Sequence, residues 1–221
     1  MRQVDTDISK DSRKEQAYDY LYNAIIKHQM RPGTSIIEQE VSNVLGISRT
    51  PVRESLNRLE SEGLVRHIKG RGTFVTEVTL QDVEEILELR EIMEIRALHN
   101  AWSRISDKEL EEQEQILMRL DVNSSEDQFY DSDRKLHELI VLYSGNQRLV
   151  IFLKTINTQI ERLRQIALYS PGREEESRKE HLAIIRCLKQ RNYHEAENQL
   201  RNHIQNVKIN TIEVFRKYSP L

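Results

Sequence analysis

Two side chains that could bind a metal or transfer a proton, Asp133 and His137, lie four residues apart in the stretch "DSDRKLHELI". Leu136 and Ile140 in the same stretch indicate a helix that buries one face. Residues four apart lie on the same side of a helix, so the acid and the imidazole point together toward the apolar side. Because a lone buried charge is costly, the fold must supply a group that compensates Asp133.

Two more histidines lie on the apolar stripes of other predicted helices. His181 shares its stripe with Ile184, Ile185 and Leu188, and His203 shares its stripe with Ala196, Leu200 and Val207. A single buried histidine is usually satisfied by a hydrogen bond, but three of them with Asp133 are better explained by a divalent metal. Asp133 and His137 would chelate the ion from one helix, and His181 and His203 would close the site from two others. One ion per chain is expected, zinc first, with nickel, manganese and iron as alternatives.

The remaining histidines form no comparable group. They are His28, His67, His99 and His194. Each is interpreted as a structural or solvated side chain.

The composition is that of a helix-rich globular protein. The chain has 221 residues, of which 31% are charged and 38% hydrophobic, with only 7 Gly and 4 Pro. The only cysteine, Cys187, cannot form an internal disulfide, and no apolar run is long enough to span a membrane. The polar start of the sequence lacks the apolar segment of a secretory signal. These features favour a cytoplasmic protein.

The periodicity of residues 1–78 predicts a winged helix-turn-helix. Helices are expected over residues 14–28 and 38–45 and from Ser48 onward. The pattern then changes to alternating β-branched residues around Gly70 and Gly72, which is typical of a β-hairpin. We expect this region to form one domain.

The periodicity of residues 79–221 predicts an all-helical bundle. Six helices are expected, over residues 79–104, 106–121, 125–144, 146–169, 173–190 and 192–217. The breaks between them are short, so neighbouring helices pack against one another. The fold class is therefore mainly α, with an N-terminal winged helix-turn-helix and a C-terminal helical bundle.

The start of the third helix carries side chains suited to contact DNA. In a helix-turn-helix the first turn of the second helix enters the major groove. Here that turn presents Ser48, Arg49, Thr50 and Arg53. Guanidinium groups bind guanine edges or phosphates, and hydroxyls bind phosphate oxygens. The alternative is an amphipathic helix whose arginines are only solvated.

This region resembles the winged helix of the GntR family of bacterial transcription regulators. The stretch "LGISRTPVRESLNRLESEGLV" followed by "GRGTFV" is close to that family's signature, and the likeness covers residues 16–76. The residues that the resemblance assigns to contact with a double-stranded operator are Arg49, Thr50 and Arg53, with Gly70 and Gly72 in the wing. Gln39 departs from the family pattern, because relatives often carry a basic residue there, so a DNA contact at this position is expected to be weaker or different.

Residues 80–215 resemble the FCD effector domain of the FadR branch of the same family. The stretches "DRKLHELIVLYSGNQRL" and "EHLAIIRCLKQRNYHEAENQLRNHI" carry the likeness. It implies a metal held by the same aspartate and three histidines, and the six helices suggest the VanR-like subgroup. It also implies that Arg90, in "ILELREIMEIRA", faces a bound organic acid. The alternative for Arg90 is a surface arginine paired with Glu94.

A ligand-controlled transcription regulator accounts for these features together. We expect a homodimer that represses its operator and whose DNA affinity changes when a small carboxylate binds near the metal in the second domain. One alternative is a DNA-binding regulator that responds to the metal alone. Another is a metalloenzyme, but the sequence shows no nucleophile motif, and an enzyme has no need of a DNA-binding domain. We therefore expect neither enzymatic activity nor membrane association.

Overall fold

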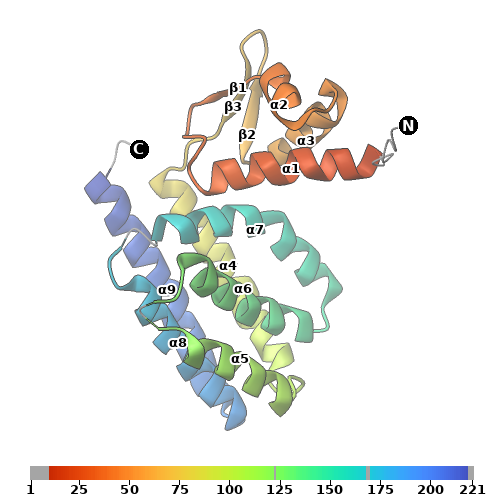
Figure 1. Cartoon of the computed structure of the whole chain (residues 1–221). Helices are drawn as coiled ribbons and strands as arrows, with labels where there is room; N and C mark the ends of the chain where they lie inside the picture. Colours follow the sequence, from red (N-terminus) through yellow and green to blue (C-terminus); the bar gives the residue numbers. More distant parts are fainter. Residues whose placement is uncertain (1–9, 122, 168–169, 219–221) are drawn as a thin grey trace. The chain divides into compact units, whose positions relative to one another are not determined.

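The computed structural model describes residues 10–121, 123–167 and 170–218. The chain divides between Val78 and Thr79 into two compact units, which are described separately below. Figure 1 labels the helices and strands of both units along the chain.

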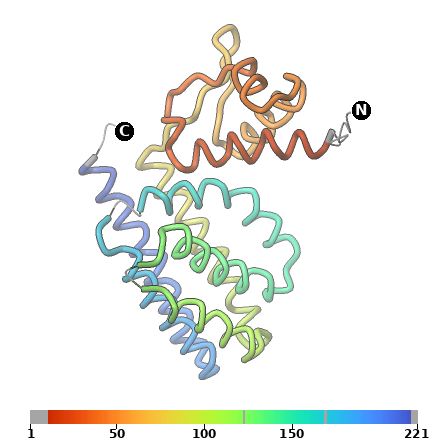
Figure 2. The backbone as a smooth tube through the Cα atoms, viewed as in Figure 1, coloured from red at the N-terminus to blue at the C-terminus, as the bar shows by residue number. Residues whose placement is uncertain are grey.

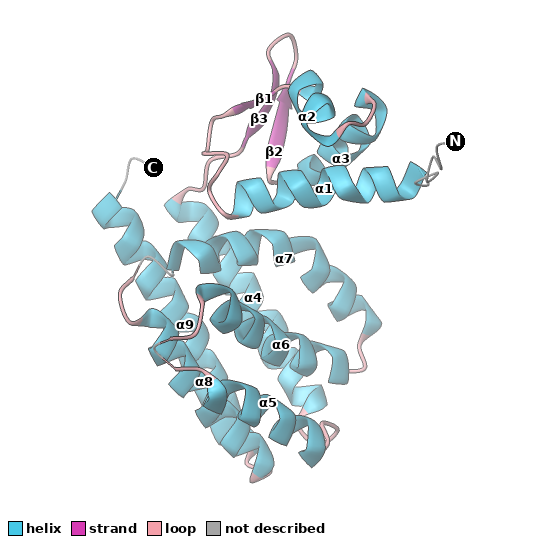
Figure 3. Ribbon diagram, viewed as in Figure 1, coloured by secondary structure: helices cyan, strands magenta, loops and turns pink. Residues whose placement is uncertain are grey.

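In residues 10–78, the described part of the first unit, three helices combine with a small antiparallel sheet. Its elements are α1 (Lys10–Ile26), β1 (Ser35–Ile36), α2 (Glu38–Leu45), α3 (Arg49–Ser61), β2 (Val65–Ile68) and β3 (Gly72–Val75). The strand order is β1-β3-β2, with both pairings antiparallel (Figure 3). The predicted winged helix-turn-helix is confirmed. Strand β1 was not predicted, because two residues are too few to show an alternating pattern.

Helices α1 and α3 pack together and hold the sheet through one apolar core. Its members include Ala17, Leu21 and Ile25 of α1, Val52, Leu56 and Leu59 of α3, and Ile36, Leu64, Val65 and Val75 around the sheet. Gly46 ends α2 in the left-handed region at φ 64°, where its N–H donates to the carbonyl of Ser42. The turn leads directly into α3, so the start of α3 is fixed relative to α2.

The second unit contains the six predicted helices. They are α4 (Leu80–Ala101), α5 (Asp107–Arg119), α6 (Glu126–Tyr143), α7 (Gln147–Ala167), α8 (Arg173–Lys189) and α9 (Tyr193–Tyr218). Capping boxes fix three of the starts, with Thr79, Ser106 and Ser125 as the N-cap residues. The predicted end of α7 at residue 169 lies outside the described residues.

The helices of the second unit surround one core. Helix α9 packs along α4 and α8, and α6 packs against α4 and α8 from the other side, as the tube in Figure 2 lets the reader follow. Apolar residues on these helices are buried, among them Leu87, Leu98, Leu136, Ile140, Ile184, Ile185, Leu200 and Val207. The predicted apolar stripes of α6, α8 and α9 therefore face a common interior. Among the described residues, no helix is long and apolar enough to cross a membrane.

Candidate metal centre and nucleic-acid interface

The structure brings the four predicted metal ligands together inside the helical bundle. Asp133 and His137 come from α6, His181 from α8 and His203 from α9, and one donor atom of each lies within 4.8 Å of the others. All three imidazoles are buried. Stripes that are distant in sequence thus converge on a single point.

The separations between the donor atoms fit one bound ion. The Nε2 atoms of His137 and His181 lie 3.2 Å and 3.3 Å from Nε2 of His203, and Oδ2 of Asp133 lies 3.4 Å from Nε2 of His137. Two ligands at ordinary metal distances of about 2.1 Å are about 3.0–3.4 Å apart for angles between square and tetrahedral. Three of the six separations fall in this range, whereas Oδ2 of Asp133 lies 3.8 Å from Nε2 of His181, so the cluster is close to the size of a transition-metal coordination sphere but slightly wider.

Two glutamates fix the tautomers of two of these histidines. Oε2 of Glu94 lies 2.5 Å from Nδ1 of His137, and Oε2 of Glu180 lies 2.7 Å from Nδ1 of His203. A carboxylate accepts a hydrogen bond from the nitrogen it faces, so Nδ1 carries the hydrogen in both neutral rings and each Nε2 has a free lone pair. These two lone pairs face each other and repel, and a cation that both nitrogens bind removes that repulsion.

The protonation states also suit a cation. Burial lowers the pKa of His137 to about 4, so its ring is neutral at physiological pH. Burial would raise the pKa of Asp133, but the neighbouring Arg164, His137, His181 and Arg90 together outweigh that effect and hold the pKa well below its usual range. Oδ2 of Asp133 is buried and accepts no hydrogen bond from any described residue. An ionised oxygen and neutral imidazole nitrogens are the ligand forms that bind divalent metals.

Three arginine–carboxylate pairs lie in and around the cluster; all three arginines are buried, whereas Asp133 and Glu180 are partly exposed. They are Arg90–Glu94 at 2.7 Å, Arg164–Asp133 at 3.0 Å and Arg173–Glu180 at 2.5 Å, measured from guanidinium nitrogen to carboxylate oxygen. Three positive charges balance three negative ones, so these six groups sum to zero. A divalent cation would therefore add two positive charges that these groups do not neutralise.

Arg90 is buried, so the interpretation of Arg90 as a surface residue is wrong. Its side chain has 0% exposure, and its Nε donates to Glu94 as that alternative expected. Its two terminal nitrogens, Nη1 and Nη2, have no hydrogen-bond partner among the described residues. The charge of Arg90 acts on Asp133, His137 and His203. A guanidinium with two unused hydrogen-bond donors therefore lies beside the cluster.

Two cavities reach the cluster from outside. A pocket of about 530 Å³ between α6 and α7 touches His137 and Arg164. Its other walls include the apolar Leu139, Leu142, Val150 and Leu153 and the basic Arg134, Lys135 and Lys154. A smaller cavity of about 40 Å³ touches Asp133 and His181. The larger one has the volume of a small organic ligand.

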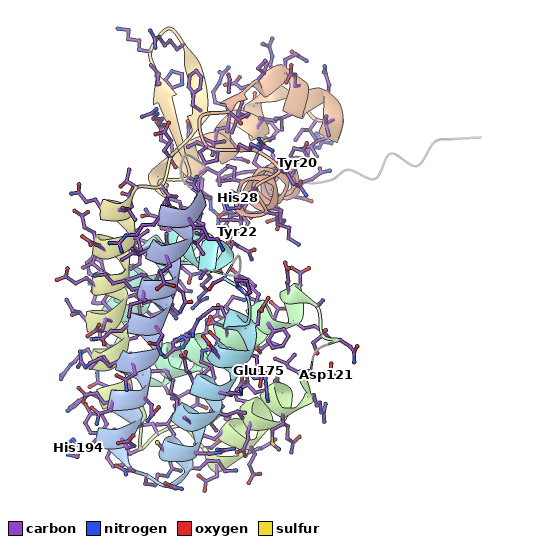
Figure 4. All side chains as sticks on the ribbon, turned by 90° about the vertical axis from the view of Figure 1, so that its left-hand side faces the viewer. Tyr20, Tyr22, His28, Asp121, Glu175 and His194 are labelled. Carbon is purple, nitrogen blue, oxygen red and sulfur yellow. The ribbon has the colours of Figure 1, made fainter. Side chains whose placement is uncertain are left out.

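The other histidines lie away from the cluster. His194 points outward from the first turn of α9 in Figure 4. His67 faces Thr73 across the hairpin, and His99 packs edge-on against Tyr193. None of them contributes a donor to the group described above.

The residues predicted to contact DNA lie together at the start of α3. Ser48 is the N-cap residue but makes no side-chain cap bond, so its hydroxyl remains available. Ser48, Arg49, Thr50 and Arg53 are all exposed, while Val52 and Leu56 on the opposite side of the helix are buried. Arg49 has no hydrogen-bond or ion-pair partner within the described chain, which leaves its donors available to DNA.

The predicted wing is the turn between β2 and β3. Gly70 and Gly72 adopt φ values of 79° and 102°, which only glycine adopts without strain. Arg71 lies between the two glycines and Lys69 directly precedes Gly70, and both basic side chains are exposed. The tip is therefore narrow and basic, a shape suited to approach a DNA backbone. At the position where the family often carries a basic residue, Gln39 donates to Asn43 of its own helix.

Comparison with known proteins identifies both units. The family model for bacterial regulatory proteins of the gntR family matches residues 13–75, and the model for the FCD domain matches residues 85–206. The HTH-type transcriptional regulator YdhC of Bacillus subtilis is 30% identical over 196 residues, which are 85% of this chain and 86% of YdhC. The HTH-type transcriptional repressor RspR of Escherichia coli is 26% identical, over 87% of this chain and 86% of RspR.

Two solved structures share the fold. E. coli McbR/YncC matches with a TM-score of 0.77 at 21% identity and covers 94% of this chain and 99% of its own. The Zn²⁺-bound FCD domain of TM0439, described as a transcriptional regulator, matches with a TM-score of 0.58 at 26% identity. That match covers 64% of this chain and 99% of the TM0439 domain.

We expect the purified chain to contain about one transition metal, and the Asp133→Ala, His181→Ala double variant to contain far less, because two of four ligands are lost. Elemental analysis per chain measures both. A chelator should lower the unfolding temperature of the wild type and leave that of the variant unchanged.

The control for this experiment is His194→Ala, which removes an exposed histidine and should keep the metal. Asp133→Asn preserves the side-chain volume if the double variant fails to fold. Wild-type protein that binds no metal after incubation with zinc or nickel would contradict the site.

Proposed function

Because the chain belongs to the GntR family of bacterial regulatory proteins and carries an FCD domain, we propose that it is a repressor whose hold on its operator is released by a small organic acid. That it is a DNA-binding transcription regulator of this type follows from the matches to both domains. Repression is supported by the relative RspR, which is named a repressor. Residues 1–78 are proposed to bind DNA, and residues 79–221 are proposed to bind the metal and the effector and to form the dimer. The protein is proposed to act in the cytoplasm.

The observation that carries the effector proposal is the charge of the buried cluster. Asp133, His137, His181 and His203 are proposed to hold one divalent metal, zinc first and nickel, manganese or iron as alternatives. A bound divalent metal supplies positive charge and an open coordination position for an anionic oxygen. Because the six charged groups around the cluster already balance, an anion is needed to neutralise the ion.

Arg90 supplies the second half of the effector site. Its Nη1 and Nη2 are buried and unsatisfied within the described chain, and an unsatisfied buried donor is costly. A carboxylate has two oxygens in the plane that a guanidinium fork binds. One organic acid could therefore satisfy both Arg90 and the ion. The pocket between α6 and α7 is lined by His137 and by Glu94, the carboxylate that pairs with Arg90, and it could hold the remaining atoms of the acid between apolar walls and basic side chains.

The effector can control DNA binding only through a difference between two arrangements of the protein. A ligand shifts an equilibrium by its differential affinity for the two states. In the proposed dimer, two winged helices meet two half-sites, so a change in the bundle alters their spacing. Exposed apolar side chains on the mutually packed α4 and α7 support a dimer contact: Leu89, Ile92, Ile151 and Phe152.

Arg49→Ala should weaken operator binding at least about ten-fold at physiological salt, because it removes an unpaired cation at the groove-facing turn. Fluorescence anisotropy with an operator selected from randomised DNA measures the affinity. The control, Lys108→Ala, removes an exposed positive charge from α5 and should bind normally. Unchanged binding by Arg49→Ala would show that α3 does not contact the DNA.

Arg90→Lys should respond about ten- to a hundred-fold more weakly to the effector, because Lys retains the charge but loses the fork. The measurement screens small mono- and dicarboxylates for release of the metal-loaded protein from its operator. Metal content should stay unchanged in the variant. If no acid alters DNA affinity while added metal alone does, the metal itself is the signal and the effector proposal fails.

Ile92→Asp combined with Phe152→Asp should convert the dimer to monomers, because a buried carboxylate at an interface is uncompensated. Light scattering after size-exclusion chromatography gives the mass. The control Met118→Asp changes an equally exposed residue on α5 and should leave the mass unchanged. Wild-type protein that is monomeric at micromolar concentration would refute the dimer.

A further inference from the structure

An ion pair joins the two helices of the DNA-binding motif at the residue that faces the groove. Oε1 of Glu38 accepts from Nε of Arg53 at 2.9 Å, and Oε2 accepts from Nη2 at 2.8 Å. Glu38 lies in the first turn of α2, and Arg53 lies in the second turn of α3. The pair is therefore bidentate. It connects α2 to α3 through two residues that are 15 positions apart in the sequence.

Stability alone is a weak explanation for this pair. The side chain of Arg53 is 63% exposed and that of Glu38 is 28% exposed, so water and salt screen their attraction, and even the bidentate geometry adds only modestly to folding. The hydrogen bonds from Arg53 lower the pKa of Glu38, so the carboxylate is ionised at neutral pH. An acid held at a surface that faces phosphates also weakens general attraction to DNA. Its placement needs a different explanation.

The geometry of the guanidinium supplies one. Arg53 has five N–H donors, and Glu38 occupies the edge formed by Nε and Nη2. The remaining edge carries one N–H on Nη1 and one on Nη2, side by side. Those two donors match O6 and N7 of guanine in the major groove. Arg49, by contrast, makes no hydrogen bond or ion pair with a described residue, although its charge acts on Glu38, so its side chain is free to turn toward a phosphate.

We propose that Glu38 is a positioning residue that fixes Arg53 so that its free edge recognises one guanine of the operator. The carboxylate reduces the freedom of a long side chain before DNA arrives, so less conformational entropy is lost on binding. It also disfavours a phosphate in the same place. The pair thus raises discrimination between base pairs more than it raises affinity.

This inference rests on the proposed DNA-binding role of α3. Glu38→Ala should bind its selected operator about ten-fold more weakly and random DNA as tightly as the wild type or more so, because it removes both the support and a negative charge. Arg53→Ala should lose preference for the same base pair. The double variant should lose no more than Arg53→Ala alone, since the two act as one unit.

The measurement is anisotropy with the selected operator, with operators altered at each base pair, and with random duplex. The matched control is Glu40→Ala, which removes an exposed acid from the same helix and should retain full base preference. Glu38→Asp, which keeps the carboxylate, should recover part of the discrimination that Glu38→Ala loses. Circular dichroism verifies that each variant is folded.

Two outcomes overturn the proposal. In one, Glu38→Ala behaves like Glu40→Ala, so that the acid has no special role. In the other, Arg53→Ala weakens all sequences equally and reduces the salt dependence by about one counterion, which identifies a phosphate contact. Wild-type protein that binds no duplex selectively would instead refute the proposed function itself.

Discussion

Three imidazole nitrogens and a carboxylate oxygen lie within 4.8 Å of one another inside the second unit. The helices that carry them, α6, α8 and α9, pack around this cluster. The Nε2 atoms of the buried His137 and His203 lie 3.2 Å apart. Burial of these rings leaves little water to separate their lone pairs. The bundle tolerates this arrangement because Glu94 and Glu180 fix the rings and arginines balance the acids. The same features would favour a bound cation over a neutral molecule.

Each unit contains an arginine that is held by a glutamate and still has free hydrogen-bond donors. In the bundle, Arg90 donates only its Nε to Glu94, and its Nη1 and Nη2 have no hydrogen-bond partner among the described residues. In the winged helix, Arg53 donates one edge to Glu38 and retains the other. A guanidinium has more donors than one carboxylate can accept, so an acid can hold it in place without saturating it. Arg90 is proposed to face an organic acid, and Arg53 is proposed to face a base of the DNA.

Much of the fold was accessible from the sequence because it rests on local signals. Helical periodicity, N-cap residues and glycines gave the six helices of the bundle and the helices of the winged unit. The convergence of His137, His181 and His203 followed from their positions on apolar stripes. Strand β1 was missed because its pairing with β3 is set by tertiary contacts. The roles of Glu180, Arg164 and Arg173 were missed for the same reason.

Some of those roles left a trace in the sequence. Glu180 directly precedes a predicted ligand, and Glu94 follows Arg90 by one helical turn. Neither spacing shows which ring nitrogen each carboxylate faces, because that depends on how α4, α6, α8 and α9 pack. The pairing of Glu38 with Arg53 spans the turn between two helices, and its bidentate form is a matter of side-chain geometry. Sequence patterns indicate faces of helices, whereas tautomers and occupied edges require coordinates.

The spread of the donors along the chain has a mechanical consequence. Asp133 and His203 are separated by about 70 residues, and an ion bound to both would close that segment into a loop, as a cross-link does. Closing a loop removes conformations from the unfolded chain, so α6, α8 and α9 would open together and not one at a time. An ion held this way would act as a reversible cross-link. It would join three helices into one cooperative unit for as long as it stays bound.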